Sequence, residues 1–417
     1  MTGRRVVITG TGLITAVGND VRSTWESLLA GRSGAAPITL FDASRHDVRF
    51  ACEVKDFDPS EYLDRKEVKR TDRFLQFALA TAQQAVAEAG IVEVLRDESP
   101  DRTGVIVGSG IGGLATLEEQ HIRMLERGPD RVSPFFIPMF IADMAAGLIS
   151  MRYGVRGPNY CTVSACASSA HAVGLAFRSI RTGEADVMIA GGTEATITPL
   201  CVAGFSSMKA LSTRNDAPES ASRPFDAGRD GFVLGEGSGM LIMESLEHAR
   251  ARGATILGEL KGFGQSADAY HMTAPAPEGA GAQVAMRHAL TDAGLEPGDI
   301  DYINAHGTST PANDATETVA IKKVFGERAY EIVVGSTKSM TGHSLGAAGA
   351  VETVISTLVC RKGLIPPTIN FEEADPECDL DYGHRGVTER PVRTALSNSF
   401  GFGGHNVALA IGRWDED

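Results

Sequence analysis

The chain has 417 residues, of which 43% are hydrophobic and 22% are charged, so it can bury a sizeable core. Its 53 acidic residues outnumber its 39 basic ones, and the resulting net charge of −14 makes nucleic acid an unexpected partner. No run reaches the roughly 18 apolar residues of a membrane-spanning helix, so we predict no membrane insertion. The six cysteines lack paired spacing, which argues against a zinc site or disulfide framework and for a reducing cytoplasm.

Strand-like runs alternate with helical segments along the chain and indicate an α/β fold. The clearest strand-like runs are residues 6–8, 105–107, 186–190, 240–243 and 407–411. Such alternation predicts parallel sheets covered by helices. Residues 231–242 also parallel residues 399–410, a weak internal repeat that indicates two copies of one α/β unit. Because no low-complexity linker separates the two copies, we expect them to share one rigid core.

A short cationic segment, residues 65–73, differs from the acidic character of the chain as a whole. It contains Lys66, Lys69 and Arg70. A charged run of this kind is most often the solvated face of a helix. The segment alone therefore does not distinguish a solvated face from a docking site.

The glycine-rich segment at residues 108–113 satisfies the G-x-G-x-x-G pattern of dinucleotide-binding loops and follows a predicted strand. In those proteins a second strand ending in an acidic residue follows about 20 residues later. No such strand follows here, so we expect no dinucleotide cofactor.

Cys166 lies among small residues at the predicted start of a helix that ends near Gly183. At such a position, unpaired N–H groups and the helix dipole stabilise a thiolate, and the same groups can hold an oxyanion. An isolated cysteine is more often a core residue. Ser168 and Ser169 could suggest a serine hydrolase, but no acid and base are arranged for them, and cysteine is the better nucleophile.

Two histidines further along the chain strengthen the case for Cys166 as a nucleophile. His306 follows a strand-like run at 300–303, and His343 follows one at 332–334. Glycine and threonine flank both, at the strand ends where open α/β sheets place their ligands. One such histidine would more often be structural, but two with a candidate nucleophile form a constellation.

A glycine-rich turn near the C-terminus, residues 397–406, carries Phe400 and Phe402. Glycine lets backbone N–H groups approach a ligand closely, and a phenylalanine in such a loop can cover an acyl pocket. At the cysteine, the two histidine motifs and this turn, the chain resembles the β-ketoacyl-acyl carrier protein synthases, of the elongating synthase II type. The resemblance covers the whole length, including residues 5–12, 211–216, 222–226 and 229–237. Residues 159–164 differ from the family pattern, which bears on pocket shape and acyl preference.

The resemblance implies a thiolase-like duplicated fold, in which two α/β halves form a layered α-β-α-β-α arrangement. Here the halves would be residues 1–255, with Cys166, and residues 256–417, with both histidines and the terminal turn. Family precedent implies a homodimer, which an apolar strand near the join of the halves also favours. Neither a metal nor a redox cofactor is expected for the reaction.

The implied reaction is a decarboxylating Claisen condensation in fatty acid elongation. Cys166 would take an acyl group from acyl-acyl carrier protein, with the oxyanion held by the N–H groups of Cys166 and Phe402. Malonyl-acyl carrier protein would then lose carbon dioxide, and His306 and His343 would donate neutral N–H bonds to the enolate that attacks the thioester. Lys338 would need a carboxylate partner if buried, and Glu317 matches the family's partner position.

Further residues carry binding roles by resemblance. Ile111, Phe205, Phe400 and Phe402 would bound the acyl pocket, although core packing would also account for Phe205. Thr308 and Thr310 could contact the pantetheine arm, and turn formation would equally account for both. The family docks an acidic carrier protein through basic positions, which here are Lys66, Lys69, Arg70, Arg131 and Lys209.

Three functional classes remain open. The first is an active condensing enzyme of fatty acid elongation. The second is a ketosynthase of a polyketide or other specialised lipid pathway, which would share the catalytic residues and differ in pocket lining and carrier. The third is a non-catalytic chain-length-factor subunit, against which the intact Cys166 argues. A thiolase would offer a second active-site cysteine near the C-terminus, and a priming synthase an asparagine in place of His343.

Overall fold

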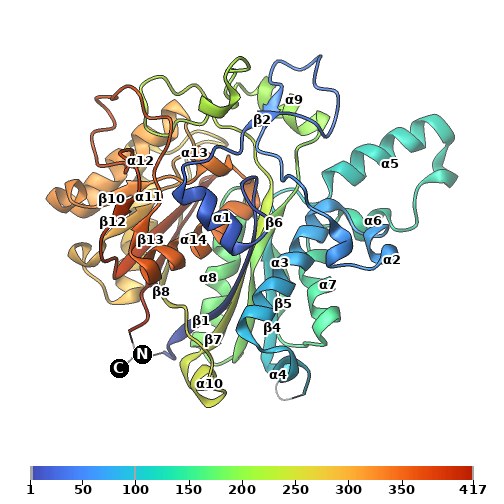
Figure 1. Cartoon of the computed structure of the whole chain (residues 1–417), viewed down its shortest axis with the longest axis horizontal. Coiled ribbons are helices and arrows are strands. Elements are labelled where there is room, and N and C mark those ends of the chain that lie inside the picture. Colours follow the sequence, from blue (N-terminus) through green and yellow to red (C-terminus); the bar gives the residue numbers. More distant parts are fainter. Residues whose placement is uncertain (1–2, 98–99, 416–417) are drawn as a thin grey trace.

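A ten-stranded mixed sheet runs through residues 3–97 and 100–415, the part of the chain that the computed structural model describes (Figure 1). The strand order is β10-β9-β13-β14-β8-β1-β7-β6-β4-β5. The N-terminal strands are β1 (Val6–Ile14), β4 (Thr103–Gly108), β5 (Asn159–Thr162), β6 (Val187–Glu194) and β7 (Gly237–Ser245). The C-terminal strands are β8 (Gly258–Ala267), β9 (Tyr302–Asn304), β10 (Val333–Gly335), β13 (Thr394–Gly401) and β14 (His405–Gly412). Two short pairs lie apart, β2 (Ala36–Pro37) with β3 (Phe50–Ala51) and β11 (Leu364–Ile365) with β12 (Thr388–Glu389).

The two groups of strands follow the same pairing pattern. In the N-terminal group, β4 pairs in parallel with β5 and β6, and β7 pairs antiparallel with β6 and β1. In the C-terminal group, β9 pairs in parallel with β10 and β13, and β14 pairs antiparallel with β13 and β8. The groups meet where β1 pairs with β8. The internal repeat therefore places β7 and β14 at equivalent positions, and the prediction of a duplicated α/β fold is confirmed.

Helices cover the strands on both sides and also lie between the two groups. The outer helices are α3 (Arg73–Ala89), against β1 and β7, and α11 (Ala280–Ala293), against β8 and β14. Two central helices, α8 (Ser168–Arg181) and α14 (Ala348–Lys362), pack against each other and against strands of both groups. This is the layered α-β-α-β-α arrangement. Residues 348–360 of α14 are all buried, as a central layer requires.

Close packing of the outer helices depends on glycine at equivalent places in the two halves. A Cβ on Gly12 of β1 would lie 2.1 Å from the Thr81 carbonyl oxygen of α3. A Cβ on Gly264 of β8 would lie 2.0 Å from the Ala285 carbonyl oxygen of α11. Any side chain at these positions would push the helix off the sheet.

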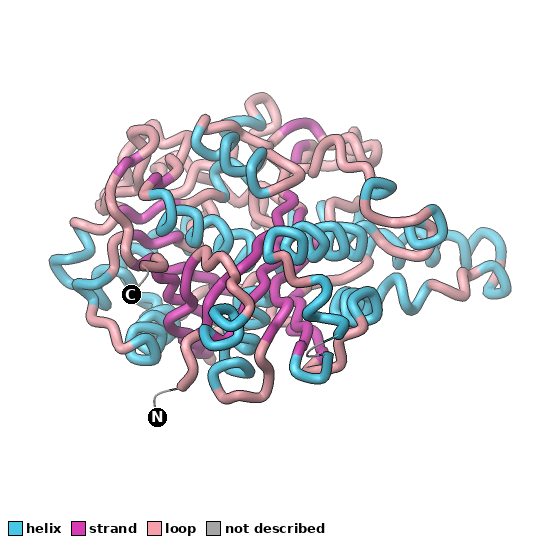
Figure 2. Tube along the Cα trace, turned by 60° about the horizontal axis from the view of Figure 1, so that its bottom comes forward, coloured by secondary structure: helices cyan, strands magenta, loops and turns pink. Residues whose placement is uncertain are grey.

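The remaining helices lie around this core and form an arm. Figures 1 and 2 show α5 and α6 extending from the main body, away from both chain ends. None of the helices in the described ranges is long and apolar enough to cross a membrane. The helices outside the layered core are α1 (Val21–Leu29), α2 (Arg65–Val68), α4 (Val92–Asp97), α5 (Leu114–Arg127), α6 (Phe136–Phe140), α7 (Met144–Tyr153), α9 (Pro199–Ser207), α10 (Leu246–Ala251), α12 (Pro311–Phe325) and α13 (Lys338–Thr341).

The strands next to the join of the halves lie inside the sheet. Both β7 and β8 have neighbours on each side, so their backbone groups are already paired inside the sheet. The N-terminal edge of the sheet is β5, which pairs only with β4. Within the described residues the sheet has two edge strands, β5 and β10.

Candidate active site

A cavity of about 560 Å³ brings together most of the predicted site residues from both halves of the chain. Its lining comes from the turn before α8, the segments after β4, β9 and α13, and the β13–β14 hairpin. The predicted residues among its lining are Ile111, Cys166, Phe205, Lys209, His306, Thr308, Thr310, Glu317, His343, Phe400 and Phe402. Lys338 lies behind this lining, and Lys66, Lys69, Arg70 and Arg131 are exposed outside the cavity.

Cys166 lies in a tight turn between β5 and α8. The helix begins at Ser168, two residues later than the sequence suggested, because Ala165 adopts a left-handed conformation with φ of 50°. Such a backbone conformation is unusual for alanine and concentrates at functional sites. The backbone N–H groups of Phe402 and of Cys166 itself point toward the sulfur and stabilise its thiolate form. These two groups are suited to hold an oxyanion beside the nucleophile.

Burial raises the pKa of the Cys166 thiol to about 12, although Lys338 and the backbone N–H of Phe402 act in the opposite direction. The prediction of a stabilised thiolate at a helix start is therefore wrong for the resting protein. The physical reason is that Cys166 precedes the helix and packs in an apolar cluster that includes Ile111 and Phe205. Removal of water from the sulfur outweighs the favourable dipoles. Cys166 thus rests as a thiol and has to lose a proton when it reacts.

The terminal glycine turn approaches the nucleophile closely. A Cβ on Gly401 would lie 2.7 Å from the Ser164 carbonyl oxygen and 3.1 Å from the Cys166 nitrogen. Only glycine fits at this contact, which places the N–H of the next residue, Phe402, beside the sulfur. The ring of Phe400 lies 5.7 Å from that of His306, and both phenylalanines line the cavity.

His306 and His343 face each other edge to face, with ring centroids 5.3 Å apart. Burial, together with the positive charge of Lys338, holds the pKa of both imidazoles well below the usual histidine value. Both rings are therefore neutral. The Nδ1 atom of each is buried without a hydrogen-bond partner. We assign the proton to Nε2, which makes each ring a donor toward the cavity.

Glu317 fixes the backbone of the His306 loop. Its side chain is buried on α12, and its two carboxylate oxygens accept hydrogen bonds from the N–H groups of His306 at 2.9 Å and Gly307 at 2.8 Å. The side-chain amide of Asn398 donates a third bond at 3.1 Å. Burial raises the pKa of this carboxyl group, and these hydrogen bonds oppose the rise. Glu317 is therefore a buried anchor for the loop.

The predicted partner of Lys338 is wrong. The Lys338 ammonium pairs with Glu352 of α14, and both side chains are almost completely buried. Glu317 is not free for this role because backbone N–H groups occupy its oxygens. Burial raises the pKa of Glu352 to about 7, while Lys338 opposes the rise. The available signal was a single acidic residue in an otherwise small and apolar helix, residues 348–360.

A buried residue with an unusual backbone conformation positions Thr308 and Thr310 at the cavity. Ser309, between them, is fully buried with φ of 70°. Its N–H donates to Asp314 at 3.2 Å, and its hydroxyl accepts from the N–H of Arg223 at 2.9 Å. The hydroxyl groups of Thr308 and Thr310 are thereby brought within 2.9 Å of each other.

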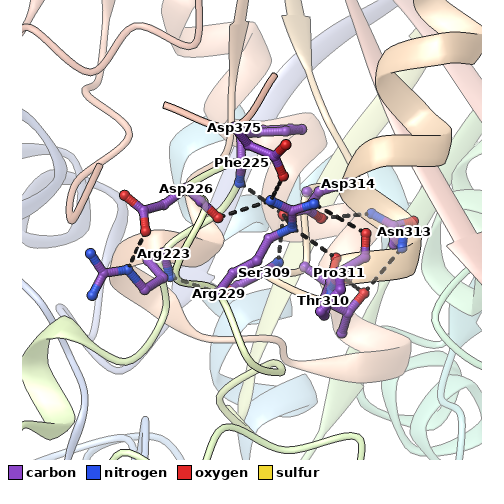
Figure 3. A network of polar contacts seen from close by, with 12 residues as sticks. Arg223, Phe225, Asp226, Arg229, Ser309, Thr310, Pro311, Asn313, Asp314 and Asp375 are labelled. Atoms are coloured by element: carbon purple, nitrogen blue, oxygen red, sulfur yellow. Dashed lines mark hydrogen bonds and ion pairs between the residues drawn. The ribbon is translucent and has the colours of Figure 1, made fainter. Parts of the chain in front are cut away.

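Figure 3 shows the charged network beneath this loop. Arg229 donates to the Thr310 carbonyl oxygen at 3.3 Å and forms an ion pair with Asp375 at 2.5 Å. A second buried pair, Arg223 with Asp226, lies beside it. Burying such charges is costly, and here ion pairs and further hydrogen bonds to loop carbonyl oxygens offset that cost.

The predicted docking residues are all exposed but are not all brought together. Lys66 lies on α2, and Lys69 and Arg70 follow it directly. The Arg70 guanidinium stacks on Phe135, which is close in sequence to Arg131, at 4.5 Å from the ring centre. Lys209 instead lines the cavity.

The G-x-G-x-x-G segment does not form an anion-binding loop. The N–H groups of Gly110 and Ile111 donate to the buried carboxylate of Glu194, at 2.7 Å and 3.2 Å. Phosphate would meet a carboxylate there instead of free N–H groups. Glu194 was missed by sequence reasoning, although its position at the end of a buried strand is unusual for an acid. In the described ranges, no group of three or more His, Cys, Asp or Glu is placed to hold a metal ion.

Comparison with known families gives two adjacent matches. Residues 3–249 match the description "Beta-ketoacyl synthase, N-terminal domain", and residues 257–372 match "Beta-ketoacyl synthase, C-terminal domain". Proteins named 3-oxoacyl-[acyl-carrier-protein] synthase 2 are 56% identical in Synechocystis and 53% identical in Coxiella burnetii. Each alignment covers 99% of this chain, and 98% and 99% of the respective relative.

Solved structures show the same fold over the full length. A β-ketoacyl synthase from Burkholderia phymatum superimposes with a TM-score of 0.91 at 36% identity, covering 99% of this chain and 100% of that one. A chain of the ishigamide ketosynthase/chain length factor has a TM-score of 0.92 at 38% identity, with the same coverage. A type II polyketide ketosynthase in complex with its acyl carrier protein has a TM-score of 0.91 at 36% identity.

Proposed function

This chain belongs to the β-ketoacyl synthase family, and from that premise we propose that it extends acyl chains by condensing them with malonyl-acyl carrier protein. The observation that carries the proposal is one cavity holding a thiol, two neutral imidazoles and two N–H groups aimed at the sulfur. These are the groups that acyl transfer and enolate stabilisation each require. The relatives at 50–56% identity are named 3-oxoacyl-[acyl-carrier-protein] synthase 2, and that name supports a role in fatty acid elongation for this chain.

The first half-reaction transfers the acyl group to Cys166. Its sulfur attacks the thioester carbonyl carbon. The oxyanion of the tetrahedral intermediate accepts hydrogen bonds from the backbone N–H groups of Cys166 and Phe402. The bond from carbon to the pantetheine sulfur then breaks, and the leaving thiolate takes up the proton that Cys166 loses. Because the thiol has a pKa of about 12, attack and proton loss have to be coupled.

The second half-reaction forms the new carbon–carbon bond. The malonyl group loses carbon dioxide, and its bonding electrons become an enolate whose oxygen accepts N–H bonds from His306 and His343. The enolate carbon attacks the Cys166 thioester, and the sulfur leaves and is reprotonated. Neutral imidazoles suit this step because each can donate a bond while the cavity accommodates a single negative charge. Glu317 anchors the His306 loop at the cavity wall, and the Lys338–Glu352 pair lies behind the lining.

Carrier protein would reach the cavity from its mouth. Thr308 and Thr310 line the cavity with paired hydroxyls that suit the polar pantetheine arm, and Lys209 lies at the same cavity. Lys66, Lys69, Arg70 and Arg131 are exposed cations on an otherwise acidic chain. They would attract an acidic carrier through long-range electrostatics. All six cysteines are free thiols, which supports a cytoplasmic setting for the reaction.

The functional assembly would be a homodimer formed at β5. This edge strand leaves one row of backbone groups unpaired, and Tyr160 and Val163 are exposed at 40% and 63%. An exposed, unpaired edge strand is a template for strand addition by a second chain. Two copies of β5 would then continue the sheet across the two chains.

A ketosynthase of a specialised pathway is the second candidate. Two structural neighbours are a type II polyketide ketosynthase and the ishigamide ketosynthase/chain length factor, and residues 159–164 depart from the elongating pattern. The identity to those neighbours is 36–38%, lower than the 50–56% to the synthase 2 proteins. A non-catalytic role conflicts with the intact Cys166 in its cavity.

The decisive experiment is incubation with malonyl-acyl carrier protein and acyl carrier proteins bearing a ladder of acyl lengths. Mass spectrometry should show the acyl group on the protein and products longer by one malonyl-derived unit. Cys166→Ala should abolish both signals. Cys161→Ala is the matched control, because Cys161 is a half-buried cysteine of β5 that does not line the cavity. Acylation of the Cys166→Ala protein, or its loss in the Cys161→Ala protein alone, would refute the assignment of the nucleophile.

A further inference from the structure

Glu194 is a fully buried carboxylate at the end of β6 that the reaction scheme leaves unused. Four donors converge on it. One oxygen, Oε1, accepts from the Ser109 hydroxyl at 3.1 Å and the Ile111 N–H at 3.2 Å. The other, Oε2, accepts from the N–H groups of Gly110 at 2.7 Å and Gly346 at 3.0 Å.

The donor set requires an acceptor with no proton of its own. Three of the four donors are backbone N–H groups, which cannot turn round to accept a bond. No ion pair to Glu194 occurs in the described part of the chain, and burial raises its carboxyl pKa to about 7 against the pull of these hydrogen bonds. A buried carboxylate without an ion-pair partner depends on its hydrogen bonds, so Glu194 and its four donors hold one another in place.

The hydrogen bonds of Glu194 join two loops that carry cavity-lining side chains. Ile111 belongs to the loop after β4, and Leu345 belongs to the turn Leu345–Ala347 in the other half of the chain. Both side chains line the cavity and pack in the apolar cluster around Cys166. The loops come so close that a Cβ on Gly346 would lie 2.2 Å from the Gly110 nitrogen. One carboxylate therefore determines the spacing of two walls of the cavity next to the nucleophile.

His343, although near in sequence to Leu345, is held by different bonds. Its N–H donates to the Val233 carbonyl oxygen at 2.7 Å, and its carbonyl oxygen accepts from the Gly235 N–H at 3.0 Å. A change at Glu194 can therefore shift Ile111 and Leu345 while leaving the imidazole in place.

We propose that Glu194 is a positioning residue that sets the spacing between Ile111 and Leu345 and thereby decides which acyl lengths Cys166 accepts. This inference rests on the proposed roles of Cys166 and His343. It separates the two half-reactions: acyl selectivity depends on Glu194, and malonyl decarboxylation does not.

The test is the Glu194→Gln variant, which keeps the shape of the side chain but presents an NH₂ group to two of the four donors. The rate of Cys166 acylation across a ladder of acyl carrier proteins should lose discrimination. We expect the ratio between the best and the poorest acyl length to change roughly tenfold, as for one lost hydrogen bond to a charged group. Carbon dioxide release from malonyl-acyl carrier protein by pre-acylated enzyme should stay within about twofold of wild type.

Ser109→Ala provides a graded comparison, because it keeps the carboxylate and removes a hydroxyl that bonds Glu194 and the Gly112 N–H, both on the Ile111 side. Its selectivity should shift in the same direction by a smaller factor. Glu236→Gln is the matched control, since Glu236 is another buried carboxylate, bonded to Arg73 and the Val54 N–H away from the cavity lining. It should lower thermal stability without changing the acyl ratio.

Two outcomes would overturn the inference: a wild-type acyl profile in both Glu194→Gln and Ser109→Ala, or equal losses in acylation and carbon dioxide release. If Glu194→Gln does not fold, Ser109→Ala decides alone, and a wild-type profile there overturns it. Cys166→Ala is assayed in parallel. Acylation of that protein would reject the proposed nucleophile, whereas its absence with unchanged acyl profiles would reject only the role of Glu194.

Discussion

Cys166, His306 and His343 line one cavity. Burial there raises the pKa of the thiol and lowers the pKa of the two imidazoles. Desolvation disfavours the charged form of each group, so it keeps the thiol protonated and the imidazoles neutral. For the histidines this is the state that donates a neutral N–H bond. For Cys166 it means that reactivity depends on the oxyanion-holding N–H groups more than on a preformed thiolate. The environment thus assigns each residue its chemical form.

Replacement of His306 by alanine should separate the two half-reactions. Cys166 should still be acylated, because its oxyanion is held by backbone N–H groups. Carbon dioxide release should fall about a hundredfold, since losing one donor to a developing oxyanion costs roughly 3 kcal/mol. The measurement is the acylation rate by mass spectrometry beside carbon dioxide release. Release at the wild-type rate would remove His306 from the mechanism.

The lowered pKa of His306 also predicts a pH-dependent stability difference. Below about pH 6.5 the unfolded chain binds a proton at this histidine and the folded chain does not. The free energy of unfolding should therefore fall as pH falls. Relative to His306→Asn, the wild-type protein should lose up to about 1.4 kcal/mol per pH unit below that value.

The comparison has to be made between these two proteins, because other buried groups act in the opposite sense. Glu194 and Glu352 have carboxyl pKa values raised to about 7, so they remove stability as pH rises from the unfolded value toward 7. Those contributions cancel in the difference between wild type and His306→Asn. Denaturant unfolding at several pH values measures it, and a difference independent of pH would contradict a neutral, buried His306.

At the scale of elements, α2 and the residues after it allow carrier binding to be tested separately from catalysis. Lys69 and Arg70 are exposed and do not line the cavity. If they receive an acidic carrier, attraction should speed encounter, and salt should weaken it because the Debye length is about 8 Å at physiological ionic strength.

Reversing Lys69 and Arg70 to glutamate should raise the apparent KM for acyl carrier protein substrates, most strongly at low salt. Turnover of a small acyl thioester such as acyl-coenzyme A should stay nearly unchanged. The matched control reverses two other exposed charges, at the end of α14, in the double variant Arg361→Glu and Lys362→Glu. It should change neither the KM for acyl carrier protein substrates nor the turnover of acyl-coenzyme A. Equal losses on both substrates would mean damage to the fold, and equal retention would make the segment an ordinary solvated helix face.

At the scale of the whole molecule, the ten-stranded sheet ends at β5 with an unpaired edge. Substituting Tyr160 and Val163 by aspartate would place like charges opposite each other if two copies pair there. Such pairs are unfavourable across a strand interface. The expected result is a shift of the solution mass from a dimer toward the 44.0 kDa monomer, measured by light scattering.

Val387→Asp is the control for that experiment, because Val387 is also an exposed apolar residue, at 42%, but lies away from β5. It should leave the mass unchanged. A wild-type protein that is monomeric over the whole concentration range would reject the β5 interface.

Local patterns determined much of this protein in advance. Alternating strands and helices, with the repeat that contains β7 and β14, predicted the duplicated α/β fold, because each copy carries its own periodicity and its own glycine turn. Cys166, His306 and His343 could be identified because each has a local setting, a strand end rich in small residues, that restricts its role. The division of the chain at residue 255 stays a prediction.

The tertiary structure alone decided which distant groups meet. Lys338 of α13 pairs with Glu352 of α14 and not with Glu317, because backbone N–H groups occupy the Glu317 oxygens. Cys166 stays protonated because apolar side chains from separate segments exclude water from its sulfur. Glu194 joins loops from the two halves. Ion pairing, desolvation and shared acceptors all depend on distances between segments far apart in the chain, which no local pattern records.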